Sequence, residues 1–220
     1  MSELVQRVED ELNDNSLVLP VICLSDSHGN FRNDIASTYK ANRGKRPLLY
    51  KALREWVFET YPAWSADAEG TTHCIRPRLE ADDILGILGT SPRNLGNCVI
   101  YSEDKDLKQI PGLHIKDVGI VKVSEWEAKV FFYTQILTGD TVDNYPGCPG
   151  VGPVKAERLF AGNGPQTDAD FWKIIVETYA KAGLTEDDAL IQARLARILQ
   201  YSDFDFKKRE PILWTPTQTT

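Results

Sequence analysis

Eight carboxylates of the sequence fall into four short groups, each at the end of an expected strand or the start of an expected helix. The groups are Asp26; Glu80, Asp82 and Asp83; Asp104 and Asp106; and Asp140 and Asp143. Because the carboxyl ends of parallel strands converge on one edge of a sheet, we expect these side chains to meet in one crevice. Gathered carboxylates repel one another, and bound cations relieve that repulsion. The pattern therefore predicts a cation site.

The chemistry of the donors narrows the choice of cation. Oxygen ligands without His or Cys nearby favour Mg²⁺ or Mn²⁺. Two such ions about 4 Å apart can activate water and hold the leaving oxygen of a phosphodiester. The chain of 220 residues has 32 acidic and 25 basic side chains. Without the eight site carboxylates, 24 acidic side chains remain, so the net charge of −7 does not exclude a DNA partner.

Each acidic group has a structural alternative when it is taken alone. The group "EADD" could be a solvated first turn of a helix, where acidic side chains are favoured. The group "SEDKDL" could be an ordinary turn with a helix N-cap, and "GDTVDN" could be a turn between helices. The ordered occurrence of all the groups at element ends favours the cation site.

The stretch "GCPGVGPVKAERL" follows the last acidic group and predicts a phosphate contact. Gly147, Gly150 and Gly152 permit positive φ, and Pro153 suits the first turn of a helix. Exposed amides at that helix start, together with Lys155, form a phosphate site that is independent of base sequence. A hairpin between two helices without any ligand is the alternative.

A basic segment from residue 31 to residue 46 is the second candidate DNA contact. Its basic side chains can neutralise phosphates, and its aromatic side chains can stack on an unpaired base. The candidates are Phe31, Arg32, Tyr39, Lys40, Arg43, Lys45 and Arg46. A plain solvated basic helix is the alternative.

The hydrophobic pattern predicts an α/β layered fold with a parallel sheet. Helical spacing of apolar residues predicts helices over residues 3–13, over 48–61 and from residue 79 onward, and short apolar runs predict strands over 16–24, 72–75 and 97–102. After residue 124 the pattern is helical. This change is the one candidate lobe boundary in the chain.

The composition predicts a soluble chain that is not exported. No apolar run reaches 18 residues, and the N-terminal segment is acidic and amphipathic. The four cysteines are scattered without a CxxC pair, which argues against a zinc site or a disulfide framework and fits a reducing cytoplasm. We therefore expect no membrane partner.

Five pieces of sequence between residues 24 and 156 resemble a known family. They are "LSDSHGNFR", "YKANR", "LEADD", "SEDKDL" and "GDTVDNYPGCPGVGPVKA". In this order they resemble the metal-dependent 5′-nucleases, also called flap-endonuclease-like enzymes, and most closely the 5′→3′ exonucleases of short-tailed bacteriophages. The resemblance implies a PIN-like core over 1–123 with an arch segment over 31–61. It also implies a helical DNA-binding lobe over 124–220 with a helix-three-turn-helix over 136–161.

The resemblance also implies roles for individual residues. The ligands of a first metal site would be Asp26, Glu80, Asp82 and Asp104, with Asp83 in the same acidic group. The ligands of a second would be Asp104, Asp106, Asp140 and Asp143. Lys40 and Arg43 match the catalytic basic pair near the scissile phosphate. The hairpin from Gly147 to Gly152 matches one that holds phosphate and K⁺.

One element of the family pattern has no counterpart in the sequence. Family members begin with a strand that ends in an "Asp-Gly" context, well before the strand that ends here at Asp26. We therefore expect a fragment, a degenerate member, or one part of a split nuclease whose first strand comes from a separate polypeptide.

The sequence as a whole predicts a Mg²⁺-dependent 5′→3′ exonuclease that acts on duplex DNA with 5′ ends or flaps. It would serve phage DNA replication or host DNA degradation in the host cytoplasm. The alternatives are a catalytically weakened protein that binds duplex ends or junctions, and a PIN-type ribonuclease. The glycine/proline hairpin argues against the ribonuclease, because it suits duplex DNA.

Overall fold

The computed structural model describes Gln6, Asp10 and the ranges 19–44, 46–67, 70–94, 96–116, 119–161 and 167–216. Most of the helix expected over residues 3–13 lies outside these residues. Gln6 and Asp10 are both helical, and Gln6 Nε2 donates a hydrogen bond to Asp10 Oδ1 at 2.9 Å. Lys45 also lies outside the described residues.

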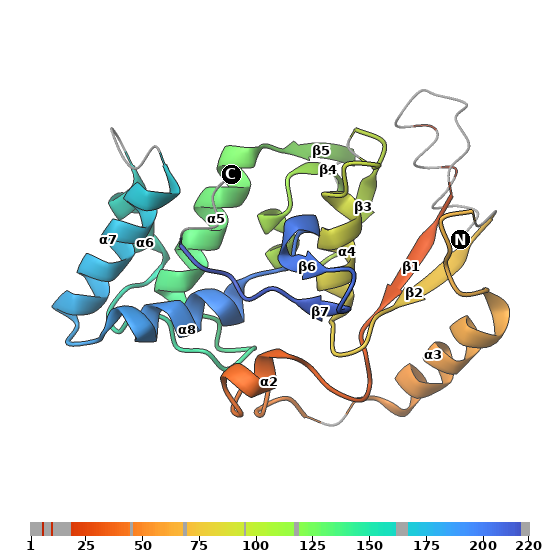
Figure 1. Ribbon diagram of the computed structural model, residues 1–220, viewed down its shortest axis with the longest axis horizontal. Helices are drawn as coiled ribbons and strands as arrows, with labels where there is room; N and C mark the ends of the chain where they lie inside the picture. The colour runs from red at the N-terminus through yellow and green to blue at the C-terminus, as the bar shows by residue number, and fades with distance from the viewer. Residues whose placement is uncertain are drawn as a thin grey trace.

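The first part of the chain forms strands and helices that alternate, as the sequence predicts (Figure 1). Strand β1 (Val21–Leu24) pairs in parallel with β2 (Thr72–Ile75). Strand β3 (Val99–Tyr101) pairs in parallel with β4 (Gly112–Lys116), and β5 (Gly119–Val123) pairs with β4 antiparallel. The α/β fold with parallel pairing is confirmed, but these five strands form two separate sheets instead of one.

Helix α4 (Ala81–Gly89) packs against β1, β2 and β3 and so connects the two sheets. Its N-terminus is fixed by Asp83, whose Oδ2 accepts a hydrogen bond from the backbone N–H of Glu80 at 3.1 Å. Gly86 allows the C-terminal chain to approach the helix closely. A Cβ at this position would lie 2.3 Å from the carbonyl oxygen of Leu199, so a side chain here would force the backbone apart.

The second part of the chain is helical. Its helices are α5 (Glu125–Thr138), α6 (Pro153–Phe160), α7 (Asp168–Lys181) and α8 (Glu186–Ala196). A reciprocal hydrogen-bonded cap between a Ser or Thr and an acidic side chain starts α5, α7 and α8, which explains where these helices begin. Aromatic packing holds the helices together: the rings of Tyr133 and Phe171 stack with centroids 4.5 Å apart.

The segment between β1 and β2 contains α2 (Arg32–Ile35) and α3 (Leu48–Thr60). The helix predicted from residue 48 is confirmed. Only Val57 of α3 is buried, whereas the exposed fraction of Leu48 is 95% and that of Leu49 is 78%. Figure 1 shows α3 at the edge of the molecule, apart from the other helices.

The C-terminal chain crosses back from the helical part to the α/β part. After α8 it forms a 3-10 turn, η2 (Tyr201–Asp203), and two short antiparallel strands, β6 (Phe204–Asp205) and β7 (Glu210–Pro211). Leu199 and Phe204 join the apolar cluster of α4 and β2. The two parts of the chain therefore share buried core. Among the described residues, no helix is long and apolar enough to cross a membrane.

Candidate active site

Acidic residues of the predicted groups follow the carboxyl ends of β1 and β3 and lie at the N-terminus of α4. Asp26 follows β1, and its Oδ2 accepts a hydrogen bond from the backbone N–H of Arg78 at 2.7 Å. Asp104 follows β3 and caps the 3-10 helix η1 (Lys105–Gln109) by accepting from the backbone N–H of Asp106 at 2.9 Å. Asp82 lies in the first turn of α4, close enough to Asp104 for their charges to interact. The structure thus brings Asp82 near Asp104, whereas the Asp26 carboxylate accepts hydrogen bonds from the backbone N–H groups of Arg78 and His28.

Lys40 connects the carboxylates of Glu80 and Asp143, which come from distant parts of the chain. Its ammonium group forms an ion pair with Glu80 and lies 3.3 Å from Asp143 Oδ2. Its backbone N–H donates to the carbonyl oxygen of Asp143 at 2.9 Å. The hydroxyl of Tyr39 lies 3.0 Å from Glu80 Oε2 and 3.1 Å from Asp143 Oδ2, and Arg43 forms a further ion pair with Asp143.

Lys105 connects a second pair of carboxylates, Asp106 and Asp140, in the same way. Its Nζ lies 2.8 Å from Asp140 Oδ2 and 3.4 Å from Asp106 Oδ1. Gln135 Nε2 also donates to Asp106 Oδ1, at 2.7 Å. Neither Lys105 nor Gln135 is among the residues predicted from the sequence. The sequence signal for Lys105 is its position between two aspartates in "SEDKDL". The prediction from this motif used only its acidic residues and therefore missed the lysine.

The pKa values of two carboxylates at the start of α4 are shifted in opposite directions. Burial alone would raise the pKa of Glu80, but the charges of Arg32 and Lys40 lower it to about 2. Burial, which is the largest cause, and the charges of Asp104, Glu80 and Asp83 together raise the pKa of Asp82 to about 7 against the opposing charge of Lys40. Asp82 is therefore the site carboxylate whose negative charge is least compensated by the protein.

Asp82 is expected to make the stability of the metal-free protein depend on pH. The folded chain keeps a proton on Asp82 above the ordinary pKa of 3.8. The unfolded chain has released it, so the free energy of unfolding falls as pH rises from about 4 to about 7. The pKa of Glu80 is lowered, so Glu80 makes the free energy of unfolding rise with pH, but only below its ordinary pKa of 4.5. Urea denaturation in EDTA at several pH values measures this slope.

The variant Asp82→Asn is the matched test, because an amide of the same shape carries no titrating proton. We expect the fall in stability between about pH 4 and about pH 7 to become shallower in this variant. An unchanged slope would show that Asp82 titrates normally in the folded protein.

Asp83 is held in a buried ion pair in this structure, which differs from the expectation that it lies with the metal ligands. Its side chain is fully buried and pairs with the buried guanidinium of Arg32 at 2.7 and 2.8 Å. Its Oδ1 also accepts from the backbone N–H of Leu199 at 3.2 Å. Arg32 donates in addition to the carbonyl oxygens of Leu195 and Arg197. This pair ties α2 to α4 and to the end of α8.

Breaking this buried pair is expected to destabilise the fold strongly. Arg32→Met leaves the Asp83 carboxylate buried without its partner, so the free energy of unfolding should fall by about 3–5 kcal/mol. Urea denaturation measures the change. The matched control is Asp34→Asn, which breaks the exposed ion pair between Asp34 and Arg78 and should change stability little. Equal effects of the two substitutions would contradict the structural role of Arg32.

Three predicted DNA contacts of the basic segment are wrong, because their side chains are buried. Phe31 packs in the cluster of Leu79 and Ile84, Arg32 pairs with Asp83, and Tyr39 packs against the helical part. None of the three can reach a base or a phosphate. Arg46 is exposed, with its guanidinium 4.5 Å from the ring centre of Tyr50, and Arg43 is half exposed.

The glycine/proline hairpin is only partly available for a phosphate. Gly147 is buried and its N–H donates to Gln192 Oε1 at 2.9 Å, so the predicted DNA contact at this residue is wrong. Gly150, Gly152 and Lys155 are exposed, and Lys155 Nζ donates to the carbonyl oxygen of Gly150 at 3.2 Å. The exposed part of the loop thus lies immediately before α6.

The donor set fits a hard divalent cation, although the carboxylates are held by basic side chains in this structure. Within the described ranges, no group of three or more His, Cys, Asp or Glu side chains forms a ready metal site. Instead the ammonium groups of Lys40 and Lys105 each lie between carboxylates of two different elements, in the place of a bridging cation. The donors are oxygen atoms, which Mg²⁺ and Mn²⁺ prefer.

The fold is PIN-like and is similar to solved structures of phage T5 proteins. A phage T5 protein co-crystallised with metal ions has a similar structure, with a TM-score of 0.59 and 17% identity over 88% of this chain and 80% of that one. The phage T5 5′-exonuclease with zinc bound is also similar, with a TM-score of 0.57 and 16% identity over 89% of this chain and 79% of that one.

Sequence comparison identifies the family. The family model described as 5′-3′ exonuclease, N-terminal resolvase-like domain, matches residues 3–137. The exodeoxyribonuclease of Enterobacteria phage T3 is 31% identical over 90% of this chain and 74% of its own length. The exonuclease of Escherichia phage T7 is 29% identical over the same shares. The chain therefore belongs to the 5′-3′ exonuclease family, a family of enzymes that hydrolyse DNA, and the resemblance inferred from its motifs is confirmed.

Proposed function

We propose that the chain is a divalent-metal-dependent 5′→3′ nuclease that hydrolyses phosphodiester bonds of duplex DNA at 5′ ends or flaps. The observation that carries this proposal is the closeness of carboxylates from α4, from η1 with its N-cap Asp104, and from the turn after α5 at one edge of the α/β core. The biological role would be DNA replication of a phage or degradation of host DNA.

The proposed metal ligands follow the sequence prediction without Asp83. Two Mg²⁺ or Mn²⁺ ions would be held by Asp26, Glu80, Asp82, Asp104, Asp106, Asp140 and Asp143. When bound, such ions lower the pKa of a coordinated water and stabilise charge on the phosphate. Asp82 favours such binding, because the burial and the neighbouring carboxylates that raise its pKa also favour a cation beside it.

The basic side chains of the site would act on the phosphate itself. Lys40 and Arg43 reach the acidic edge from the segment before α3, and each is paired there with a carboxylate. A scissile phosphate that enters the site offers them a competing anion, and their positive charge would stabilise the charge that develops in the transition state.

The helical part would bind the duplex away from the reacting bond. Residues 136–161 would form a helix-three-turn-helix in the lobe 124–220, with exposed amides near Gly150 and Gly152 and the ammonium of Lys155 available to one phosphate. A K⁺ ion at this hairpin would add a fixed positive charge. The segment 31–61, with α3 exposed, would form an arch beside the core 1–123.

A 5′-labelled duplex tests the proposal directly. The purified chain should release labelled mono- or oligonucleotides with Mg²⁺ or Mn²⁺ and none in EDTA, while salt-sensitive binding of the duplex persists in EDTA. Binding without release in either metal would contradict the nuclease and support a second candidate, a protein that only binds duplex ends. The observation that favours this second candidate is the pairing of the carboxylates with Lys40 and Lys105.

A further inference from the structure

The 3-10 helix η1 carries two polar side chains on one of its faces. Asp106 and Gln109 are three residues apart, and side chains at this spacing eclipse each other in a 3-10 helix. Helix α5 packs against η1 and carries Gln135, which is buried with an exposed fraction of 5%. Gln109 is buried as well. Two buried amides therefore adjoin a carboxylate that belongs to the proposed metal ligands.

Hydrogen bonds fix the orientation of both amides. The backbone N–H of Ile198 donates to Gln109 Oε1 at 3.1 Å, and Gln109 Nε2 donates to the carbonyl oxygen of Ala196 at 2.7 Å. Gln109 Nε2 also donates to Gln135 Oε1, and Gln135 Nε2 donates to Asp106 Oδ1 at 2.7 Å. A backbone N–H can only donate and a carboxylate can only accept, so neither amide can turn over without losing bonds.

These bonds form a chain that leads from the end of α8 to the acidic edge. Ala196 is the last residue of α8, where backbone carbonyl groups have no partner within the helix. Gln109 supplies that partner from η1. A buried polar group that loses its partner costs about 1–3 kcal/mol, so the native arrangement of the chain of bonds is strongly favoured.

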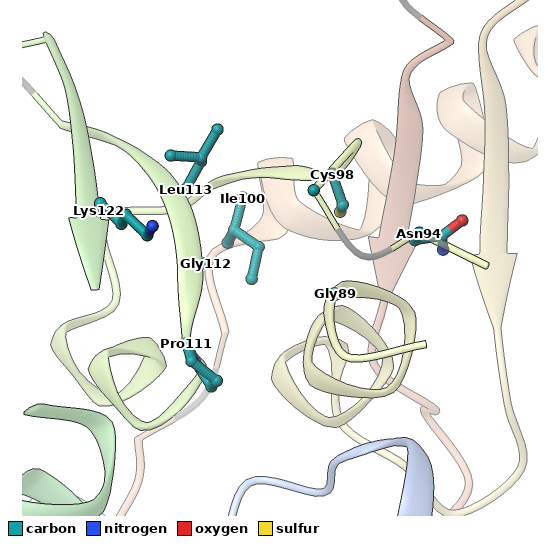
Figure 2. A pocket seen from close by; sticks show the side chains of 9 residues that line it. Gly89, Asn94, Cys98, Ile100, Pro111, Gly112, Leu113 and Lys122 are labelled. Carbon is teal, nitrogen blue, oxygen red and sulfur yellow. The ribbon is translucent and has the colours of Figure 1, made fainter. Parts of the chain in front are cut away.

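Apolar contacts hold η1 in place independently of the amides. Leu107 and Ile110 are fully buried and form a cluster with Ile100 of β3. Ile100 and Pro111 also line an apolar hollow of about 370 Å³ beside β3 (Figure 2). Because apolar side chains anchor both η1 and the chain that follows it, the loss of one amide should leave η1 where it is.

Gln135 differs from Lys105, which also contacts Asp106, in that it carries no charge. The ammonium of Lys105 competes with a metal ion for the carboxylate, and its side chain is 65% exposed, so it is free to leave. The amide of Gln135 does not offset the negative charge of Asp106. It can stay bonded to Oδ1 and restrict rotation of the carboxylate while Oδ2 binds a cation.

We propose that Gln135 is a positioning residue for the divalent cation: its amide orients the Asp106 carboxylate, and Gln109 holds that amide in its orientation. This inference rests on the proposed function, in which Asp106 is a metal ligand. Replacing a group that orients a metal ligand through a hydrogen bond typically costs about 10–100-fold in metal affinity or activity.

Gln135→Met tests the proposal, because methionine has a similar length and cannot donate a hydrogen bond. Isothermal titration calorimetry of the complete chain without DNA measures the affinity for Mn²⁺. We expect the affinity for one Mn²⁺ ion to fall by about 10–100-fold. Binding of duplex DNA in EDTA should stay unchanged, since no metal takes part in it.

Tyr179→Phe is the matched control on the same helix pair. The hydroxyl of Tyr179 is buried and donates to the carbonyl oxygen of Ile136, the neighbour of Gln135 on α5, at 2.6 Å. The substitution removes a buried hydrogen bond of α5 and leaves the bond to Asp106 in place. It should lower the stability against urea and leave the affinity for Mn²⁺ unchanged.

Gln109→Met tests whether Gln109 acts through Gln135. Alone, this substitution should weaken Mn²⁺ binding, because the amide of Gln135 is then free to turn. Added to Gln135→Met, it should weaken Mn²⁺ binding little further, since the bond that it supports is already absent. Losses that simply add in the double variant would overturn the proposed order of the chain of bonds.

Unchanged Mn²⁺ affinity in Gln135→Met, or an equal loss in Tyr179→Phe, would overturn the positioning role. If Gln135→Met does not fold, NMR of the unchanged chain replaces it: Mg²⁺ should shift the side-chain amide signals of Gln135, and signals that do not move would overturn the proposal. A chain that binds Mn²⁺ with the expected effect of Gln135→Met yet releases no nucleotide would contradict the nuclease and still support the positioning role.

Discussion

Asp104→Asn is expected to reduce the release of nucleotides from a 5′-labelled duplex by about a thousandfold. Asp104 is the one residue shared by the two proposed ligand sets, so the substitution removes a charged donor from both. The fold should be unaffected, because Asp104 is exposed and the amide oxygen of Asn can still accept from the backbone N–H of Asp106. Binding of duplex in EDTA should therefore stay close to that of the unchanged chain.

Glu103→Gln is the matched control for this substitution. Glu103 is the exposed neighbour of Asp104 and belongs to neither proposed ligand set. Its replacement removes the same charge and should leave nucleotide release nearly unchanged. Comparable losses in both variants would show that general electrostatics, not ligation by Asp104, controls the reaction. Nearly full activity in Asp104→Asn would contradict the proposed ligand sets.

Gly147→Ala should unfold or severely destabilise the helical part, with a loss of about 4 kcal/mol or more. The backbone of Gly147 has a positive φ of 65° and lies against the turn before Asp140. A Cβ would be 2.3 Å from the nitrogen of Gly139 and 2.7 Å from the carbonyl oxygen of Leu137. These neighbours are backbone atoms, which cannot move aside without breaking the turn that positions Asp140. Urea denaturation followed by circular dichroism measures the loss.

Gly150→Ala separates backbone strain from crowding. Gly150 also has a positive φ, of 73°, but nothing lies within 4 Å of a Cβ built on it. We expect only the cost of the left-handed conformation, about 1–2 kcal/mol. If Gly147→Ala lowered the free energy of unfolding no more than Gly150→Ala does, the close approach between Gly147 and Gly139 would not constrain the turn.

The apolar runs and motifs of the sequence predicted the elements of the α/β part well. The strands at Val21–Leu24 and Thr72–Ile75 and the helix Leu48–Thr60 follow from local patterns, since short apolar runs and helical periodicity depend on neighbouring residues alone. The gathering of carboxylates at one edge was also predictable, because the direction of parallel strands fixes which ends meet.

The errors concern residues whose environment is set by distant parts of the chain. Arg32 appears in a basic, polar stretch, yet the end of α8 supplies two carbonyl oxygens and α4 supplies Asp83, so the side chain is buried. Tyr39 is buried by the helical part for the same reason. Local sequence does not contain these contacts, and the division of the sheet into two pieces is likewise a property of tertiary pairing.

The two lysine ammonium groups between the carboxylates make metal binding an exchange of counter-ions. A divalent ion bound by Glu80 or by Asp143 must displace Lys40, and one that joins Asp106 to Asp140 must displace Lys105. Each displaced ammonium then needs a new anion, and a DNA phosphate is one. Because linkage between two ligands is reciprocal, DNA should raise the affinity for the metal by the same factor by which the metal raises the affinity for DNA.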